Sequence, residues 1–437
     1  MAGLSCGIDI GSTNIKVVLA DARGRSRWVK SVATPRRHDG LGPVTDAAAL
    51  VAQLEDMIIA GWRDAGGGVP LMAIAASGVG EDGIGVDGGL NPTGHALAWF
   101  DKRAADETAW LARAYPDHRF YFYTTACKWL WLRKHRAGEL KTAGCWVALT
   151  DYPSAVWSGS AFMSETLAAR TGCFNMLTRQ WLPRLLAASR APSMPRVLKA
   201  GQVAGTMMPG RLRAAGAASA ATVLVAGGHD HAMAASAIRR LAADARVDSI
   251  GTANVIYGET IIPPSRNVAS DLDISVPALG GPGIALMGVT EFSAALLDSF
   301  GGGAAVRSLL AVPRLAGEPA LEHAGSDPAP RFRRVLELMT RRAHGFLRDL
   351  DDAGVPQGAI FAAGGFARST ALIELRASVF GEPVTVIDEP ELAALGAALL
   401  ASEGASGNPA VFEAASTLRV VDPLPRWSQA YSQWRQR

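Results

Sequence analysis

The stretch of sequence that decides the fold is VLVAGGHDHAMAASAI, residues 223–238. Its first four residues, Val223–Ala226, are apolar and partly β-branched, which predicts a short buried strand. Gly227-Gly228 predicts a turn in which the backbone can approach a ligand closely. His229-Asp230-His231 follow this turn, and Ala232–Ile238 predicts the start of a helix. The stretch therefore predicts a strand-to-helix corner that carries a carboxylate.

Asp230 at this corner is open to two interpretations. Open α/β sheets bind ligands at the carboxyl ends of their strands, so a carboxylate there suits a functional site. The flanking His229 and His231 would tune or orient it, either through substrate contact or through structural hydrogen bonds. Alternatively, Asp230 merely caps the helix. Zinc binding is not expected, because an HxH pair needs further ligands and none is evident.

Length and composition limit the class of protein. The 437 residues suffice for two or more domains, and 49% hydrophobic with 19% charged residues indicates a soluble globular chain. A net charge of +3, with both signs spread along the chain, gives no reason to expect a nucleic-acid partner. No stretch has the apolar character of a membrane span. Four widely separated cysteines without CxxC spacing favour the reducing cytoplasm. A homodimer is a common state of soluble proteins and is the general expectation here.

The order strand, glycine turn, strand, helix, strand occurs twice along the chain. The first copy comprises strands at residues 4–10, 15–20, 27–33 and 71–76, with a helix at 46–61. The second comprises strands at 247–251, 255–260, 360–363 and 384–387, with helices near 335–350, 370–379 and 391–401. One side of the first helix is predicted to face the core through Leu50, Leu54, Met57, Ile58 and Gly61. Such duplication predicts two similar α/β domains that face one another across a cleft.

Glycine turns with hydroxyl or amide side chains occur at three places, each after a predicted strand. They are Gly7–Lys16 (GIDIGSTNIK), Ser249–Asn254 (SIGTAN) and Ala362–Ser369 (AAGGFARS). Backbone N–H groups and small hydroxyls of such turns can surround phosphate oxygens, while a carboxylate such as Asp9 holds Mg²⁺. Each turn taken alone is equally well explained as an ordinary hairpin or loop. None has the GxxxxGK[ST] spacing of a Walker A loop.

Together these motifs resemble those of the FGGY-type carbohydrate kinases, members of the actin-like ATPase superfamily. GIDIGSTNIKVV is similar to their first phosphate motif, SIGTANVIYGET to their second, and AAGGFARSTALIELRASVFGEPVTV to their adenosine motif. The resemblance covers most of the chain. It implies an α/β fold with two ribonuclease H-like (actin-like ATPase) domains flanking a central cleft. The expected domains are residues 1–224, with the sugar site and first phosphate motif, and residues 225–437, with the other two motifs.

The resemblance also implies roles for individual residues. Asp230 matches the catalytic aspartate, and Asp9 would hold Mg²⁺. The residues expected to bind ATP are Gly11, Ser12, Thr13, Asn14, Gly251, Thr252, Gly364, Gly365 and Ser369. The residues expected to surround the sugar are Glu81, Trp99, Asp101, Arg103 and Tyr123. His229 and His231 are expected to join them because they flank Asp230, not because the family has them. The implied activity is ATP-dependent phosphorylation of a hydroxyl of a small sugar, polyol or sugar acid.

The chain departs from the family pattern in three respects. Glycerol-kinase-like members carry a sugar-contacting Arg-Glu pair, of which this chain keeps Glu81 but has Gly80 in place of the arginine. The segment between the second phosphate motif and the adenosine motif is shorter than usual, which implies a shortened second domain. The His-Asp-His triplet also differs from the flanks of xylulose or glycerol kinases. The sugar therefore stays open, as do two alternatives: a catalytically impaired sugar sensor and an actin-fold ATP-binding regulator.

Overall fold

The computed structural model describes residues 3–262, 271–300, 306, 328–413 and 418–435. Its contacts divide the chain into two compact units. Unit 1 comprises Met1–Ala237, Ser275–Gly281 and Ala393–Glu413, and unit 2 comprises Ile238–Ile274, Pro282–Leu392 and Ala414–Arg437. The domain division that the sequence predicts, between residues 224 and 225, stays a prediction, because compactness alone does not define a domain.

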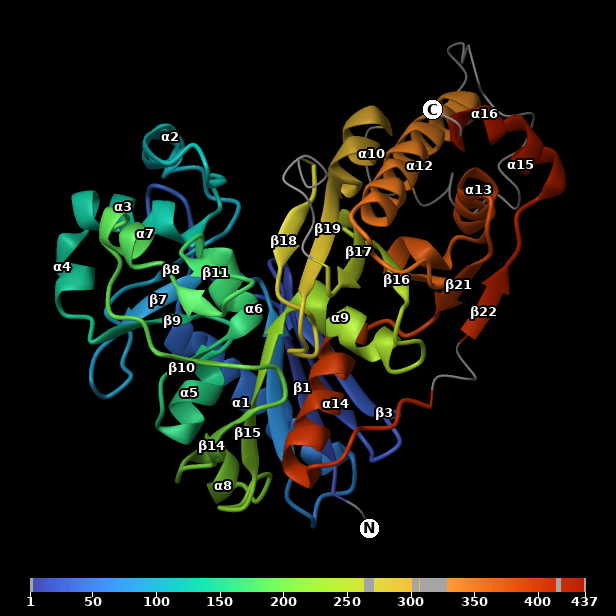
Figure 1. Ribbon diagram of the computed structural model, residues 1–437. Helices are drawn as coiled ribbons and strands as arrows, with labels where there is room; N and C mark the ends of the chain where they lie inside the picture. Colours follow the sequence, from blue (N-terminus) through green and yellow to red (C-terminus); the bar gives the residue numbers. More distant parts are fainter. Residues whose placement is uncertain (1–2, 263–270, 301–305, 307–327, 414–417, 436–437) are drawn as a thin grey trace. The chain divides into compact units, whose positions relative to one another are not determined.

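A six-stranded mixed sheet forms the centre of unit 1 (Figure 1). In sheet order its strands are β14 (Val203–Thr206), β15 (Val223–His229), β6 (Ala73–Gly78), β1 (Ser5–Ile10), β2 (Asn14–Ala20) and β3 (Ser26–Ala33). The first three strands in the chain form the antiparallel meander that their tight turns predict. β6 pairs parallel to β1, and β15 pairs parallel to β6. The carboxyl ends of these three strands therefore lie at one edge of the sheet.

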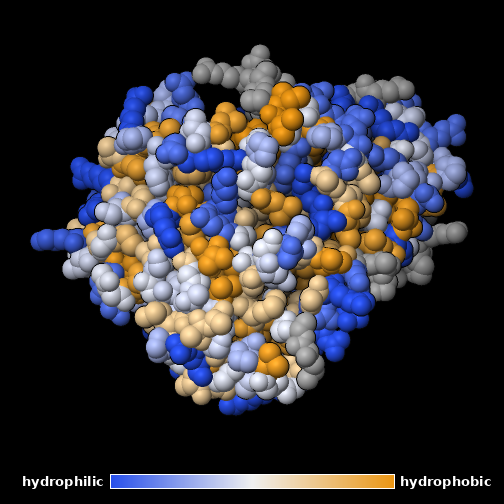
Figure 2. Space-filling view, turned by 60° about the horizontal axis from the view of Figure 1, so that its bottom comes forward, coloured by the Kyte–Doolittle hydropathy of each residue, from blue (hydrophilic) through white to orange (hydrophobic). Residues whose placement is uncertain are grey.

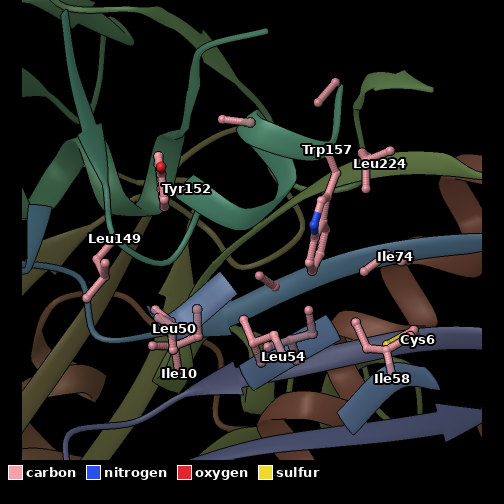
Figure 3. Packing of buried hydrophobic residues seen from close by; sticks show 14 of the residues in the cluster. Cys6, Ile10, Leu50, Leu54, Ile58, Ile74, Leu149, Tyr152, Trp157 and Leu224 are labelled. Carbon is pink, nitrogen blue, oxygen red and sulfur yellow. The ribbon is translucent and has the colours of Figure 1, made fainter. Parts of the chain in front are cut away.

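Helix α1 (Ala47–Asp64) covers one face of this sheet. Asp46 caps it by accepting a hydrogen bond from the backbone N–H of Ala49 at 3.0 Å. The five positions predicted to face the core are all buried. Figure 3 shows Leu50 and Leu54 of α1 packed among side chains of the sheet and of helix α5 (Tyr152–Ser158). The 3.6-residue period of apolar positions thus places this helix correctly from the sequence alone.

Helix α14 (Leu392–Ser406) covers the opposite face (Figure 1). Ala73 and Ala75 of β6 pack against Ala397 and Ala401, whereas their neighbours in β6 join the core beneath α1. Small residues here let the helix approach the strands closely. At Gly7 of β1 a Cβ would lie 1.8 Å from a backbone oxygen of α14, so only glycine fits. Asp9 follows two residues later on the same face of the strand.

Shorter elements complete unit 1. The strands are β4 (Arg36–His38), β5 (Pro43–Thr45), β7 (Gly83–Val86), β8 (Ala96–Leu97), β9 (Cys145–Ala148), β10 (Phe162–Ser164), β11 (Phe174–Asn175), β12 (Gln180–Trp181) and β13 (Arg196–Leu198). The helices are α2 (Ala105–Ala114), α3 (Thr125–His135), α4 (Ala137–Lys141), α6 (Glu165–Ala168), η1 (Ala169–Thr171), α7 (Pro183–Ala188), α8 (Arg211–Ala214) and α9 (Asp230–Arg239), which continues into unit 2. A second hydrophobic cluster lies among these elements, with Trp129 and Trp146 in edge-to-face contact at its centre.

Unit 2 contains a seven-stranded sheet with the same pattern of strand directions. In sheet order its strands are β18 (Asp273–Ser275), β19 (Ile284–Glu291), β17 (Ala253–Thr260), β16 (Arg246–Ile250), β20 (Ile360–Ala363), β21 (Val384–Ile387) and β22 (Leu418–Val421). β16 pairs antiparallel with β17 and parallel with β20, as β1 does with β2 and β6. The predicted duplication of the strands and of the helix before the third predicted strand is therefore confirmed, and it extends to topology. The helix predicted at 391–401 for the second copy is α14, which packs on the sheet of unit 1 instead.

The helices of unit 2 are α10 (Ser293–Phe300), α12 (Pro328–Asp352), η2 (Gly365–Arg368), α13 (Thr370–Phe380), α15 (Pro425–Ala430) and α16 (Ser432–Arg435). Helix α12 begins earlier than the predicted residue 335. Its core side carries Phe332, Leu336, Ala343, Phe346 and Leu350, which are all buried.

None of the helices in the described ranges combines the length and the apolar character that crossing a bilayer requires. On the face shown in Figure 2, hydrophobic and hydrophilic residues alternate in small groups. Scattered apolar side chains of this kind are common on protein surfaces.

Candidate active site

Three carboxylates lie at or just beyond the edge of the unit 1 sheet where its parallel strands end. Asp9 is the penultimate residue of β1, Glu81 follows the end of β6 by three residues, and Asp230 directly follows β15. The pairing registers place Asp9 beside Ser77 of β6, and Gly228 beside the same serine. Residues far apart in the sequence are thus brought to one sheet edge, which is where open α/β sheets bind ligands.

The path of β15 into Asp230 differs from the predicted corner. The predicted turn at Gly227-Gly228 is wrong, because β15 runs through both glycines to His229, with a register shift between Val225 and Gly228. Helix α9 then begins at Asp230 instead of Ala232. The glycines are needed for space: a Cβ on Gly227 would lie 1.9 Å from the carbonyl oxygen of Ala76 in the neighbouring strand.

Asp230 lies between two imidazoles. Its Oδ1 is 3.4 Å from Nδ1 of His229 and 3.7 Å from Nε2 of His231, and it accepts a hydrogen bond from the backbone N–H of His231 at 2.6 Å. A capping side chain accepts from the backbone N–H two or three residues later, whereas this bond comes from the next residue. The bond therefore differs from that of a helix cap. The side chain of Asp230 retains 31% of its exposure, so it is accessible to a ligand.

The surroundings of Asp230 hold it in the charged form. Burial alone would raise its pKa, but His231, His229 and Lys16 together lower the pKa below its ordinary value. For His229 the balance goes the other way, because burial lowers its pKa to about 4 despite the attraction of Asp230. At neutral pH the pair therefore consists of a carboxylate and an uncharged imidazole, with a proton acceptor available at Asp230.

Asp9 and Lys16 face each other across β1 and β2. They are directly paired in the sheet register, and Nζ of Lys16 lies 3.3 Å from Oδ2 of Asp9. Ser77 donates a long hydrogen bond of 3.5 Å to Oδ1 of the same carboxylate. Asp9 is 5% exposed, so it is a desolvated anion with a cation on one side. Among the described residues no group of three or more His, Cys, Asp or Glu side chains is arranged to hold a metal ion.

The first glycine turn, between β1 and β2, is held in shape by hydrogen bonds to its backbone carbonyl groups. The N–H of Gly11 donates to the carbonyl of Asn14 at 3.0 Å, and the hydroxyl of Thr34 donates to the carbonyl of Gly11 at 2.8 Å. Nε of Arg36 donates to the carbonyl of Ser12 at 2.7 Å. The tip at Thr13 and Asn14 is exposed. The turn thus presents an ordered, accessible tip beside Asp9.

Glu81 is paired with an arginine that the sequence analysis did not single out. Nε of Arg170 lies 2.6 Å from Oε1 of Glu81, and the Arg170 guanidinium stands over the ring of Tyr123 at 5.7 Å. Burial alone would raise the pKa of Glu81, but Arg170 in particular lowers it below the usual range. Tyr123 also meets the edge of Trp99, with ring centroids 6.4 Å apart. The structure therefore brings Glu81, Tyr123 and Trp99, three of the predicted sugar-binding residues, into one cluster through Arg170.

Asp101 and Arg103 form a separate ion-pair cluster. Nη2 of Arg103 lies 2.6 Å from Oδ2 of Asp101, and Nη1 lies 2.9 Å from Oδ2 of Asp39. Arg136 also pairs with Asp39 at 2.6 Å. The guanidinium of Arg103 lies over the ring of Trp131. Asp101 and Arg103 are thus engaged with each other and with neighbouring protein side chains. Their contact with the sugar stays a prediction.

A buried lysine lies behind Glu81. Nζ of Lys128 donates to the carbonyls of Glu81 at 3.2 Å and Leu97 at 3.1 Å, and lies 3.7 Å from Oδ1 of Asp82. Burial lowers the pKa of Lys128 and raises that of Asp82. Arg36 reaches the other side of Asp82 at 3.4 Å. Lys128, Asp82 and Arg36 thus link the backbone of Glu81 to that of the first glycine turn, and sequence spacing offered no signal for this link.

In unit 2 the second glycine turn lies between β16 and β17. The N–H of Gly251 donates to the carbonyl of Ala253 at 2.9 Å, and Thr252 is exposed at the tip. Asn254 donates to buried Asp248 at 2.6 Å and accepts from Arg376 of α13 at 2.9 Å. The turn is thus tied to the helix of the predicted adenosine motif.

The Gly-Gly pair of that motif follows β20. Gly364 has a φ of +95°, and a Cβ there would lie 2.6 Å from the carbonyl oxygen of Ile250. At Gly365 a Cβ would meet nothing within 4 Å, so its backbone borders open space. Ser369 caps α13 by accepting from the N–H of Leu372 at 3.4 Å. Bare backbone next to open space is a surface on which a flat ring can lie.

Two parts of the chain match domains of one protein family. Residues 4–237 match the N-terminal domain of the FGGY family of carbohydrate kinases, and residues 325–405 match its C-terminal domain. The chain belongs to the FGGY family of carbohydrate kinases. The predicted family and the predicted enzyme class, a carbohydrate kinase, are thereby confirmed. No curated protein matches the sequence at a significant level.

Solved structures of FGGY kinases share the fold. A xylulose kinase from Rhodospirillum rubrum has a TM-score of 0.85 at 19% identity, covering 99% of this chain and 97% of its own. A xylulose kinase from Lactobacillus acidophilus has a TM-score of 0.83 at 19% identity, covering 99% and 96%. A gluconate kinase from the same organism has a TM-score of 0.80 at 19% identity, covering 100% and 96%. These FGGY structures confirm the predicted α/β class and two-domain actin-like ATPase fold.

Proposed function

We propose that this FGGY kinase transfers the γ-phosphoryl group of ATP to a hydroxyl of a small sugar, polyol or sugar acid, with Asp230 as the general base. The observation that carries this proposal is the environment of Asp230. It is an accessible carboxylate at the carboxyl edge of the unit 1 sheet, flanked by His229 and His231, and it stays charged at neutral pH. Xylulose, gluconate and glycerol kinases among its structural neighbours have substrates of this kind.

Asp230 would accept the proton of the attacking hydroxyl. A pKa below the usual range makes it a weak base, but phosphoryl transfer has a loose transition state in which positioning matters more than early proton removal. General-base assistance of this type typically contributes ~10²–10⁴ in rate. His229, neutral at pH 7, would orient the carboxylate or the hydroxyl without adding a positive charge that competes for the proton.

Asp9 fits the carboxylate that would hold Mg²⁺. It is a buried anion at the strand end, next to the exposed tip of the first glycine turn. Mg²⁺ keeps most of its waters and needs only one or two protein carboxylates, so a single aspartate suffices. When bound, the ion would neutralise negative charge on the phosphate oxygens. Lys16, paired with Asp9, would balance its charge when the metal is not bound.

The nucleotide would be held by backbone and small hydroxyls of the three glycine turns. The proposed contacts to phosphate are Gly11, Ser12, Thr13, Asn14, Gly251 and Thr252, and those to adenosine are Gly364, Gly365 and Ser369. The exposed tips at Thr13 and Thr252 and the open space beside Gly365 support these assignments. The proposed sugar contacts are Glu81, Trp99, Asp101, Arg103, Tyr123, His229 and His231.

Sugar-dependent release of ADP tests this function. Wild type would be compared with Asp230→Asn and Asp230→Ala over a panel of ketoses, alditols and aldonic acids. We expect turnover with at least one class, and a loss of about 10²–10⁴ in kcat in both variants with unchanged melting temperature. Asp56→Asn, an exposed aspartate paired with Arg211 on the surface, is the matched control and should keep full activity.

Three other outcomes would contradict the proposal. Binding of a sugar without any turnover, seen as a raised melting temperature, would favour a sugar sensor. ATP hydrolysis that no sugar changes would favour an ATP-binding regulator. Retention of full activity in Asp230→Ala would show that another group removes the proton.

A further inference from the structure

Residue 80 is glycine in a position where any side chain would collide with its surroundings. A Cβ built on Gly80 would lie 2.5 Å from Cγ of Arg170 and 2.6 Å from Cδ2 of His229. Real Cβ atoms essentially never approach other heavy atoms so closely. The space beside Glu81 is therefore already filled, and it is filled by the aliphatic part of an arginine from another segment. An arginine at position 80 and Arg170 in its present place would exclude each other.

Arg170 is delivered by a segment that is anchored at the same sheet edge. It lies in η1, directly after α6, and Gly172 ends η1 with a φ of +76°. Thr166 of α6 accepts a hydrogen bond from the backbone N–H of His229 at 2.9 Å. The segment that carries Arg170 is thus tied to the residue that precedes Asp230, so its guanidinium has a fixed position relative to the proposed base.

Arg170 and Glu81 form a close pair that is largely removed from water. Nε to Oε1 is 2.6 Å, and the two side chains retain 14% and 7% of their exposure. Burying such a pair is costly, and the net gain in stability over an apolar pair is often nil or negative. A buried ion pair beside the proposed base is therefore better explained by ligand recognition than by stability. Tyr123, under the guanidinium, holds it in place from a second side.

The chemistry of the pair indicates the ligand. A guanidinium only donates hydrogen bonds and a carboxylate only accepts them, so the two together match two neighbouring hydroxyls of one molecule. The charges of Arg170 and Glu81 cancel, and Asp230 nearby is negative. The two lysines near this cluster, Lys128 and Lys16, are paired with the carboxylates of Asp82 and Asp9. Among these described groups, a carboxylate on the ligand would therefore be repelled by Glu81 and Asp230 and attracted mainly by the Arg170 guanidinium. Neighbouring hydroxyls on an uncharged carbon chain fit without this repulsion.

We propose that Arg170 is the sugar-binding arginine of this kinase, in the role that position 80 cannot fill, and that with Glu81 it selects adjacent hydroxyls of an uncharged ketose or polyol over a sugar acid. This inference rests on the proposed function, since it assigns the substrate class to the same site. The chain would thus keep an arginine beside Glu81 although residue 80 is glycine, because Arg170 comes from another segment.

The test uses Arg170→Met and Arg170→Lys in the full chain, with xylulose, xylitol, glycerol and gluconate as probes. Arg184→Met is the matched control, because Arg184 also lies over a tyrosine ring but belongs to α7. We expect Arg170→Met to raise the sugar KM at least tenfold with the best uncharged probe and to leave the ATP KM within twofold. Arg170→Lys keeps the charge but loses the planar fork, so it should restore only part of the affinity. The control should match wild type.

A second measurement separates ligand contact from a structural role. The best probe is compared with its analogues that each lack one hydroxyl. If Arg170 donates to a hydroxyl, removal of that hydroxyl should cost wild type at least tenfold in kcat/KM but cost Arg170→Met little. Equal losses in both proteins for every analogue, or an unchanged sugar KM in Arg170→Met, would overturn the proposal. Gluconate as the preferred probe would overturn the assignment of an uncharged substrate.

Failure of the proposed function would give a different result. If no probe supports ADP release, the same panel is tested by the rise in melting temperature of wild type and Arg170→Met. An uncharged probe that raises the melting temperature of wild type but not of Arg170→Met would support the role of Arg170 in a protein that binds without transfer. Absence of any such rise with every uncharged probe would overturn it.

Discussion

Arg376 of α13 and Asp248 of β16 are both fully buried and lie 3.6 Å apart between Nη1 and Oδ2. Asn254, the second residue of the strand after the second glycine turn, bridges them with hydrogen bonds to both. Burial lowers the pKa of Arg376 and raises that of Asp248, so each charge depends on the other. This cluster connects the proposed phosphate turn of unit 2 to the helix of the proposed adenosine site.

Arg376→Met should therefore destabilise the protein by about 3–5 kcal/mol, because it leaves the Asp248 carboxylate buried without a cation. Denaturant unfolding measures this loss. Arg368→Met is the matched control, since Arg368 pairs with Asp388 at an exposed site and should change stability by less than about 1 kcal/mol. Equal effects of the two substitutions would contradict the view that burial of the pair matters.

Gly227→Ala should distort the strand that carries Asp230. The new Cβ would lie 1.9 Å from the carbonyl oxygen of Ala76, and backbone in the middle of a sheet cannot move aside cheaply. We expect a loss of roughly 3 kcal/mol in the free energy of unfolding and a large fall in kcat, as the carboxylate shifts.

Gly138→Ala is the control for this substitution. Its Cβ would meet nothing within 4 Å, and Gly138 lies in helix α4, so stability should stay the same or rise by up to about 1 kcal/mol. A Gly227→Ala protein with normal stability and kcat would show that the strand can relax around the methyl group.

Local patterns predicted several main elements of the fold. β20 and β21 begin and end at the predicted residues, because each is a short, mostly apolar run that is followed directly by a residue typical of turns, Gly364 or Asp388. The core face of α1 follows from helical periodicity. The path of β15 did not follow from its sequence, since Gly227-Gly228 has the composition of a turn. Only the neighbouring strand, through Ala76, explains why both residues are glycine.

The sequence predicted those residues of the candidate site that lie in recognisable motifs, but not their partners elsewhere in the chain. Asp9, Glu81 and Asp230 stand at or near the ends of strands, and the motifs that carry them could be recognised in the sequence. The partner of Glu81 could not, because Arg170 lies 89 residues away in a short helical segment without a motif of its own. The departure at Gly80 was a signal that something else fills that space, but it did not identify Arg170. Pairings between distant side chains depend on the tertiary fold.

Acid should destabilise the protein through His344 of α12. This side chain is 9% exposed and stacks on Phe380, and burial, with Arg348 and Arg435 nearby, lowers its pKa to about 4 from an ordinary value near 6.5. Between these two values the unfolded chain binds more protons than the folded protein, so stability falls as the pH falls from 6.5 to 4. The contribution of His344 should be about 1–2 kcal/mol after allowance for solvent screening.

His344→Phe keeps an aromatic ring for the stack and removes the titration. Urea unfolding at pH 7 and pH 4.5 should show a smaller loss of stability in this variant than in wild type. Exposed His118→Gln is the control and should lose as much stability as wild type. The same loss in all three proteins would mean that other groups cause the acid sensitivity.

Arg36→Met should weaken ATP binding more than sugar binding. Arg36 donates to the carbonyl of Ser12 in the first glycine turn and contacts buried Asp82, so its loss frees the turn from the sheet edge. Because small displacements of positioning groups are costly in phosphoryl transfer, we expect the ATP KM to rise about tenfold and kcat to fall. The neighbouring Arg37→Met, which removes an exposed pair with Asp46, is the control and should leave both constants within twofold. Steady-state kinetics with ATP and sugar varied in turn separates the two KM values, and an unchanged ATP KM in Arg36→Met would show that the turn keeps its shape without this link.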